Sequence, residues 1–172
     1  MSLPAALDTL TAAVDADAAN AQVGFRVTGS LTGPTKVALR SGRHAVTVDE
    51  PPALGGADAG ASPVEHALIA LASCHAIAYR VWATKLGLEL DDVEVRAEGE
   101  LDLRGFLGLD TSVRAGFTDV RIVVTPKGPE PAERYRELAE AVDQHCPVLD
   151  LFSNATPVER ELAIAAEPAG AS

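Results

Sequence analysis

The first half of the chain alternates apolar and polar side chains in short runs. Residues 23–28 follow a period of two, and residues 36–41 and 44–50 repeat it on either side of the turn Ser41-Gly42. Such alternation is typical of strands with one buried face. The segment TGSLTGPT, residues 28–35, has the glycine and proline content of a turn. We therefore expect three short strands in an antiparallel meander.

A long central helix is predicted from residue 63 to Leu86. Residues 62–65, SPVE, combine a capping box with proline at the first helical position, and Gly87 offers a left-handed stop. The middle of the segment, residues 67–73, is apolar or small all round, which predicts a helix buried on most sides. His75 and Arg80 soon interrupt the apolar run, so we do not expect a membrane span.

The second half predicts two more strands, a helix and a closing strand. Residues 93–103 alternate, and after a turn residues 117–125 form the next strand. Apolar positions spaced by three and four then predict a second helix that ends at Cys146, because Pro147 disfavours helix at the residue before it. Residues 158–166 predict the last strand. Strands that come in runs, rather than alternating singly with helices, define an α+β fold class.

The chain length suits one domain with a short extension. The alanine-rich residues 3–19 predict a helix, so we assign residues 1–20 to an N-terminal helical extension. Residues 21–167 then form the α+β domain. Residues 168–172 are expected to be a loose tail.

The net charge of the chain limits the classes of partner that it can bind. The formal net charge is −11. A surface of that sign repels phosphate backbones and anionic lipid, so we expect neither nucleic acid nor a membrane as a partner. The first residues carry only acidic charge and no basic segment leading into an apolar one, which favours a cytoplasmic protein. In a reducing compartment the two cysteines are not expected to form a permanent disulfide.

Cys74 and Cys146 are the residues most able to carry chemistry. Cys74 interrupts the apolar run of the long helix, and Cys146 falls on the core-facing stripe of the second helix. Two interpretations stay open: a pair of small buried thiols, or a reactive pair that meets in space. A reactive thiol needs thiolate character. Since Cys74 lies too far from its helix start to feel the helix dipole, a cation must come from elsewhere, and the candidates are Arg26, Arg40 and Arg43.

The residues near Cys74 in the sequence point away from it. His75 is turned about 100° around the helix, so we expect a poor partner for that thiol. Glu65 and Cys74 lie on opposite faces of a regular helix. The simpler interpretation of Glu65 is the acid of the capping box, and a catalytic role requires an irregular first turn or a second chain. Cys74-His75 and His145-Cys146 lack the spaced pairs of zinc sites, and no nucleotide-binding motif occurs, so we expect no metal and no cofactor.

Three segments in a fixed order resemble one known family. They are DEPPALGG at residues 49–56, SPVEHALIALASC at residues 62–74 and HCPV at residues 145–148. Together they resemble the OsmC/Ohr family of osmotically inducible and organic hydroperoxide resistance proteins, over residues 23–166. The resemblance implies a two-layer α+β fold of antiparallel sheets with a long buried central helix. It also implies an intertwined homodimer with two equivalent sites at the subunit interface.

The resemblance further implies an activity. The best-understood members reduce organic and fatty-acid hydroperoxides. By position, Cys74 attacks the peroxide and becomes a sulfenic acid, Cys146 condenses with it to a disulfide, and a dithiol such as dihydrolipoamide restores both thiols. Neither a metal nor an organic cofactor is needed. The alternative is a non-catalytic dimer of the same fold that binds an apolar small molecule at its interface.

The polar partners of the first thiol depart from the family pattern. The peroxidase branch has a glutamate where this chain has Val64, with Glu65 one place later. It also has an arginine in its early hairpin, where this chain has the turn Gly33-Pro34. Glu65 and Arg43 are therefore the substitutes that we expect beside Cys74. Arg43 is chosen because its strand precedes the loop that leads into the Cys74 helix.

Overall fold

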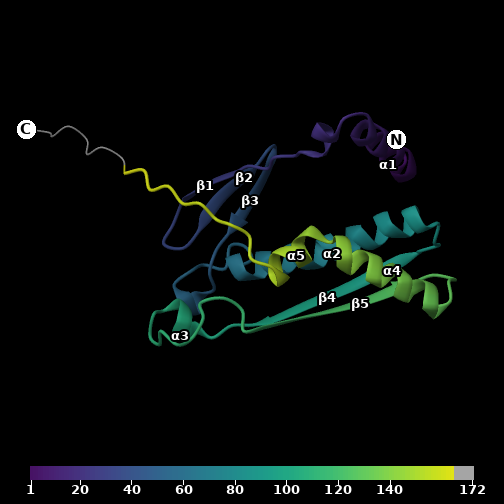
Figure 1. Cartoon of the computed structure of the whole chain (residues 1–172). Helices are drawn as coiled ribbons and strands as arrows, with labels where there is room; N and C mark the ends of the chain where they lie inside the picture. Colours follow the sequence, from purple (N-terminus) through teal and green to yellow (C-terminus); the bar gives the residue numbers. More distant parts are fainter. Residues whose placement is uncertain (165–172) are drawn as a thin grey trace, which may run out of the picture.

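The computed structural model describes residues 1–164 as helices combined with two small antiparallel sheets (Figure 1). This confirms the predicted α+β class. The elements, in chain order, are α1 (Leu3–Ala16), β1 (Val27–Leu31), β2 (Val37–Ser41), β3 (His44–Val48), α2 (Pro63–Leu86), β4 (Asp92–Glu100), α3 (Leu103–Phe106), β5 (Asp119–Lys127), α4 (Ala132–His145) and α5 (Pro147–Ser153), with short 3₁₀ helices at Ala18–Ala21 and Pro52–Leu54.

The two sheets lie on different sides of α2. Strands β1, β2 and β3 pair in chain order, and β4 pairs with β5 along the full length of both. In Figure 1 the β4–β5 hairpin runs beneath α2 and α4, while the three-stranded sheet stands above α2. Helix α2 packs on both β4 and α4. The central helix, one hairpin and α4 therefore form the packed part of the chain.

Helix α2 has both ends that the sequence predicts. The Oγ of Ser62 accepts a hydrogen bond from the Glu65 backbone N–H, and the Oε2 of Glu65 accepts one from the Ser62 N–H at 2.7 Å. These two bonds complete the capping box. At the other end Gly87 has a φ of 64°, in the left-handed region that strains a side chain. The predicted bounds of this helix are confirmed.

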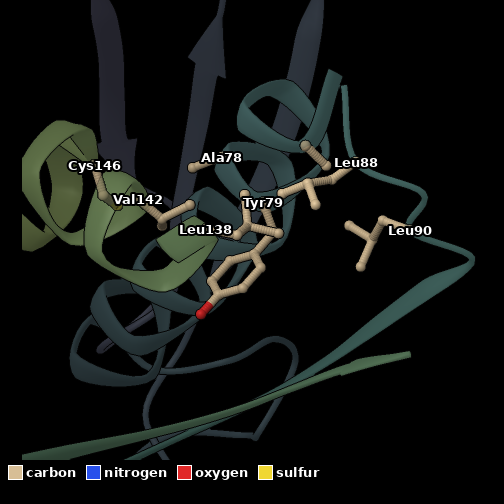
Figure 2. Close-up of a cluster of buried hydrophobic side chains, with 8 residues drawn as sticks. Ala78, Tyr79, Leu88, Leu90, Leu138, Val142 and Cys146 are labelled. Carbon is tan, nitrogen blue, oxygen red and sulfur yellow. The ribbon is translucent and has the colours of Figure 1, made fainter. Parts of the chain in front are cut away.

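The core lies where α4 crosses α2 (Figure 2). Leu138 and Val142 of α4 are fully buried and face Ala78 and Tyr79 of α2. Cys146 lies in the same cluster at the end of α4. Burying one Val or Leu side chain contributes about 1.5–3 kcal/mol. These contacts hold α4 on α2 and so fix the position of Cys146 relative to the central helix.

Only one side of α2 is buried within the chain, which corrects the expectation of a helix covered on most sides. On the opposite side Ile69 and Ile77 are exposed, Ile77 to 64%. The apolar pattern therefore marks a surface that one chain leaves uncovered. The buried positions repeat at helical spacing: Leu71, His75, Ala78, Tyr79 and Ala83.

By length and composition alone, α2 is also long and apolar enough to cross a bilayer, contrary to the expectation from His75 and Arg80. Its most apolar window of 18 residues has a mean hydropathy of 1.3, and 22% of that window is buried. A core helix meets the same two criteria. Because α2 packs on α4 and on β4, we interpret it as a core helix with one open side.

Two strand predictions need correction. Strand β1 begins at Val27 rather than Val23, because Val27 already pairs with Ser41, the last residue of β2. Residues 28–31, which were expected to form a turn, pair with β2 instead. The closing strand expected at residues 158–166 is not formed in its described part, residues 158–164, which is irregular and exposed. The remainder of that strand and the predicted tail, residues 168–172, lie outside the described residues.

Two short helices, α3 and α5, were not predicted from the sequence. Strand β4 ends at Glu100, and α3 takes over the last residue of the expected strand 93–103. Pro147 ends α4 as predicted and is at the same time the first residue of α5. A proline at that position costs no hydrogen bond, because the first N–H groups of a helix have no partner within it.

The loop that leads into α2 is built around the buried carboxylate of Asp49. This carboxylate accepts hydrogen bonds from Thr35 Oγ1 at 2.6 Å and from the backbone N–H groups of Glu50, Ala57 and Ala59. These donors lower the pKa of Asp49 to about 2, the Thr35 hydroxyl most of all. The loop therefore folds back on itself and places residue 62 at the start of α2.

Candidate functional site

The structure brings the two cysteines into contact. Cys74 lies midway along α2, and Cys146 lies at the junction of α4 and α5. Their sulfur atoms are 3.4 Å apart. Both are free thiols, since a disulfide has sulfur atoms about 2.05 Å apart. The contact between the two thiols is therefore observed, and their reactivity stays a prediction.

The two thiols differ in their access to solvent. Cys74 is partly exposed, whereas Cys146 is only 2% exposed. Burial raises the pKa of the Cys146 thiol, the backbone N–H groups of Leu149 and Val148 oppose that effect, and neighbouring Cys74 adds to it. A dissolved reactant therefore reaches Cys74 first, and Cys146 stays protonated to a higher pH than an ordinary thiol.

His75 is a neighbour of the second thiol that sequence reasoning missed. Its side chain is 1% exposed, and its Nδ1 lies 3.1 Å from the carbonyl oxygen of Leu71 and 3.6 Å from the Cys146 sulfur. Its Nε2 lies 4.0 Å from an Asp143 carboxylate oxygen. We expected His75 to be a poor partner for Cys74, and no hydrogen bond within residues 1–164 joins those two side chains. No pattern in the sequence pairs His75 with Cys146, because the contact depends on how α4 packs on α2.

Glu65 lies at the start of α2 and away from the thiols. Its Oε2 accepts from both the N–H and the Oγ of Ser62, each at 2.7 Å. These bonds lower the pKa of its carboxyl group, the backbone bond most. Glu65 also borders a hollow on the exposed side of the helix, together with Leu68 and Ile69. The capping function is therefore observed, and a role at a thiol stays a proposal.

Arg43 occupies the turn between β2 and β3. It is exposed, as are Arg26 and Arg40. Within residues 1–164, no hydrogen bond or ion pair joins a lysine or arginine to Cys74 or Cys146. The structure of one chain thus brings the thiols together but brings none of the three candidate arginines to them.

An open groove is lined by residues of α2, β5 and α5, and neither cysteine is among its lining residues. Leu71 of α2 and Leu149 of α5 line one part of it, and Leu149 packs against the core cluster that holds Cys146. Phe117 and Phe152 line another part, with ring centroids 6.3 Å apart. Its volume is about 510 Å³, and both Arg114 and Asp119 lie in its wall. The groove can take an apolar chain that carries a polar end.

The described residues form no group able to hold a metal ion. Among residues 1–164, no cluster of three or more histidine, cysteine or acidic side chains has the required geometry. Cys74, Cys146 and His75 converge, but His75 directs its Nε2 away from the sulfur atoms. The side chains that converge at this point are two thiols and one imidazole.

Fold and site together define an α+β protein with a dithiol centre between two helices. The OsmC-like protein family matches residues 55–161, which is more than half of the chain. The chain belongs to this family. No curated protein is similar enough in sequence to match.

Solved structures agree on the fold. An OsmC-like protein from Mycoplasma pneumoniae superposes with a TM-score of 0.67 at 16% identity, covering 77% of this chain and 89% of that one. An organic hydroperoxide resistance protein OsmC from Legionella pneumophila gives 0.58 at 20% identity, with 76% and 89% covered. The organic hydroperoxide resistance protein OhrB of Bacillus subtilis gives 0.53 at 24% identity, with 75% and 90% covered.

Proposed function

We propose that this protein is a thiol-dependent peroxidase that reduces organic hydroperoxides through Cys74 and Cys146. The observation that carries the proposal is the 3.4 Å separation of two free thiols held on separate helices. Two similar structures are named organic hydroperoxide resistance proteins. The open groove lined by Leu71, Leu149, Phe117 and Phe152 suits the organic part of such a substrate.

Cys74 carries the first step, because it is the more accessible sulfur. Its thiolate attacks the terminal oxygen of the hydroperoxide, the O–O bond breaks, and the alkoxide leaves and takes up a proton to become an alcohol. Cys74 is then a sulfenic acid. The Cys146 thiolate attacks that sulfur, expels hydroxide as water and forms the disulfide. A dithiol reductant such as dihydrolipoamide restores both thiols by two exchange steps and is itself oxidised to a disulfide.

A second copy of the chain is part of the proposal. Ile69 and Ile77 on α2 and the side chains of β1 are exposed within one chain, and an apolar surface of this kind marks an interface. We propose a homodimer in which the second copy covers the open side of α2. Obligate interfaces of this kind bury about 2,000 Å² or more in total.

In the proposed dimer, Arg43 and Glu65 can act on a thiol across the interface. Neither contacts a thiol of its own chain, and Glu65 borders the exposed side of α2. We propose that they act across the interface on a thiol site completed by the second copy. Arg43 would stabilise the Cys74 thiolate and the leaving oxygen, an effect worth roughly 10²-fold in rate for one donor.

The wider assignments follow from charge and family. We propose a cytoplasmic protein that needs no metal or organic cofactor and has no nucleic acid or membrane partner, in keeping with its net charge of −11. Residues 21–167 would form the OsmC-like domain. Residues 1–20 would be an extension whose helix α1 lies against the end of α2, where Leu7 and Val81 line one hollow.

A second candidate function is a non-catalytic dimer that binds an apolar small molecule. It is favoured by the groove of about 510 Å³ and by the absence, within residues 1–164, of a cation bonded to either thiol. In this case the thiols would be buried neighbours without a catalytic cycle. The two functions differ in whether Cys74 is required for turnover.

Turnover of an alkyl hydroperoxide with dihydrolipoamide tests the proposal. Cys74→Ser should abolish it, and Cys146→Ser should allow a single turnover and leave Cys74 as a sulfenic or over-oxidised acid. Ala76→Ser, a similar change two positions along the same helix, is the matched control and should retain activity. Equal rates for the wild type and Cys74→Ser would leave only the binding function. Arg43→Ala in the same assay should slow the first oxidation by roughly 10²-fold.

A further inference from the structure

We propose that His75 is the catalytic base that takes the proton of the Cys146 thiol, and that Asp143 is the positioning residue for the resulting imidazolium. The proposal rests on the proposed peroxidase function and deepens it, because it assigns the proton transfer of the disulfide-forming step. It stands on the position of one buried imidazole between a sulfur atom and a carboxylate.

The two nitrogens of His75 face different partners. Nδ1 lies 3.6 Å from the Cys146 sulfur and 3.1 Å from the Leu71 carbonyl oxygen. Nε2 lies 4.0 Å from the Asp143 carboxylate and makes no hydrogen bond within residues 1–164, although the side chain is 99% removed from solvent. A buried polar nitrogen without a partner is unfavourable. Nδ1 therefore has two neighbours, a carbonyl oxygen and a thiol, and Nε2 is directed at a charge.

The protonated ring fits these surroundings better than the neutral one. The neutral ring carries one hydrogen, and neither nitrogen suits it fully. With the hydrogen on Nδ1, which can donate to the Leu71 carbonyl oxygen, the lone pair of Nε2 faces the Asp143 carboxylate. With the hydrogen on Nε2, the lone pair of Nδ1 faces the Leu71 carbonyl oxygen and can accept the Cys146 proton, and this is the form that acts as the base. In the imidazolium, Nδ1–H donates towards Leu71 and the Cys146 thiolate, and Nε2–H donates towards Asp143. The thiolate–imidazolium pair thus places opposite charges next to each other on both sides of the ring, with the Asp143 carboxylate at the ion-pair distance of 4.0 Å.

The second thiol needs such a base more than the first. Burial raises the pKa of Cys146, yet attack on a sulfenic acid requires the thiolate. In the proposed step the S–H bond of Cys146 breaks and its proton moves to Nδ1, while the other ring proton stays on Nε2 beside Asp143. The thiolate forms the S–S bond with Cys74, the S–O bond of the sulfenic acid breaks, and the departing hydroxide takes the proton from His75. One water leaves, and no outside reactant is consumed.

The other titratable groups at this site are few. Tyr79 lies one turn after His75, and both burial and the charge of Asp143 raise its pKa, so its hydroxyl stays neutral. Cys74 contacts Cys146 from the same helix as His75. The β4 side chains that turn inward are apolar or glycine, the charged ones being exposed. Asp143 and the two thiols are therefore the groups that act on the His75 charge.

The test measures the ionisation of Cys146 directly, without peroxide. In Cys74→Ser, Cys146 is the sole cysteine, so the ultraviolet absorbance of its thiolate can be followed against pH. Adding His75→Asn should raise the midpoint by about one pH unit or more, a tenfold loss of thiolate at a given pH. An unchanged midpoint would overturn the proposal.

Asp143→Asn supplies a second test on an exposed side chain whose replacement leaves the fold intact. It should raise the midpoint less than His75→Asn does, and it decides the matter if His75→Asn does not fold. Glu140→Gln, the same charge change on an exposed position of α4, is the matched control and should leave the midpoint unchanged. Equal midpoints for Asp143→Asn and Glu140→Gln would overturn the positioning role of Asp143.

Kinetics separate this proposal from the peroxidase function itself. With both cysteines present, His75→Asn should leave the first oxidation of Cys74 unchanged and slow the disulfide step by roughly 10²-fold at pH 7. The gap should close as the pH rises, because hydroxide then removes the thiol proton; a factor that is equal at every pH would mean a structural role and overturn the proposal. Failure to form any sulfenic acid at Cys74 would count against the peroxidase function, while the absorbance titration would still decide the role of His75.

Discussion

The two sides of α2 offer the sharpest contrast in the molecule. On the side that faces α4, the helix is packed tightly enough to bury His75 almost completely and to set two sulfur atoms 3.4 Å apart. On the other side Ile69 and Ile77 are exposed, and the β1 strand of the three-stranded sheet has no buried residue. The same helix therefore carries a packed thiol site on one side and an exposed apolar surface on the other.

The contrast separates what one chain can supply from what a second copy must add. The thiol pair and its imidazole all belong to a single chain, so the proposed disulfide step needs no residue of a second copy. The candidate arginines lie on the unpacked part and contact neither thiol. Substitutions that disrupt the contact with the second copy should therefore impair the peroxide step and leave the disulfide step intact.

The largest expected effect comes from the open side. Ile77→Asp places a charge in the proposed interface, and burying an unpaired carboxylate costs several kcal/mol, so the dimer should dissociate at micromolar concentration. Sedimentation velocity measures this directly. Ile77→Leu keeps the apolar volume and should remain dimeric. A monomeric wild type, or a dimer that persists in Ile77→Asp, would contradict the claim that a second copy covers the exposed side of α2.

The packed side should respond to a core truncation instead. Leu138 is fully buried against α2, and Leu→Ala changes at such positions cost about 2–5 kcal/mol of the free energy of unfolding. Leu138→Ala should lose that much in urea unfolding at a fixed protein concentration and keep its oligomeric state. Leu151→Ala, at an exposed position, is the matched control. Similar losses for both variants would show that α4 is not the element that holds the packed side.

The smallest effect concerns acid stability of the loop before α2. The folded pKa of Asp49 is lowered from its ordinary 3.8 to about 2 by the hydroxyl of Thr35 and by backbone donors. A lowered pKa stabilises the folded state above the unfolded pKa, and this contribution is lost as the pH falls through the folded pKa. Asp49→Asn should therefore melt lower than wild type at pH 5, with the difference shrinking towards pH 2. Asp58→Asn in the same loop should show no such trend.

Local patterns predicted the packed side well and the open side poorly. The capping box and Gly87 fixed the bounds of α2 because each acts through neighbours in the sequence. Strand β1 was misplaced because its start depends on where β2 ends, at Ser41. The closing strand at residues 158–166 was predicted from alternation alone, and alternation does not supply a partner strand.

The site was predictable in its residues but not in its contacts. Cys74 and Cys146 stand out as core-facing thiols, yet only the crossing of α2 and α4 shows that they touch. His75 was judged against Cys74, its neighbour in sequence, whereas its contact is with Cys146 on another helix. The capping contact of Glu65 is predictable because it is local, whereas its expected role beside Cys74 stays a prediction.

The central claim is that Cys74 and Cys146 act as one redox pair, and peptide mapping after oxidation tests it most directly. The protein is treated with one equivalent of an alkyl hydroperoxide, alkylated at low pH and digested. The account predicts a single disulfide-linked peptide pair that joins Cys74 to Cys146, with both free thiols lost together. Two thiols that stay free while the hydroperoxide is consumed, or an over-oxidised Cys74 beside a free Cys146, would contradict it.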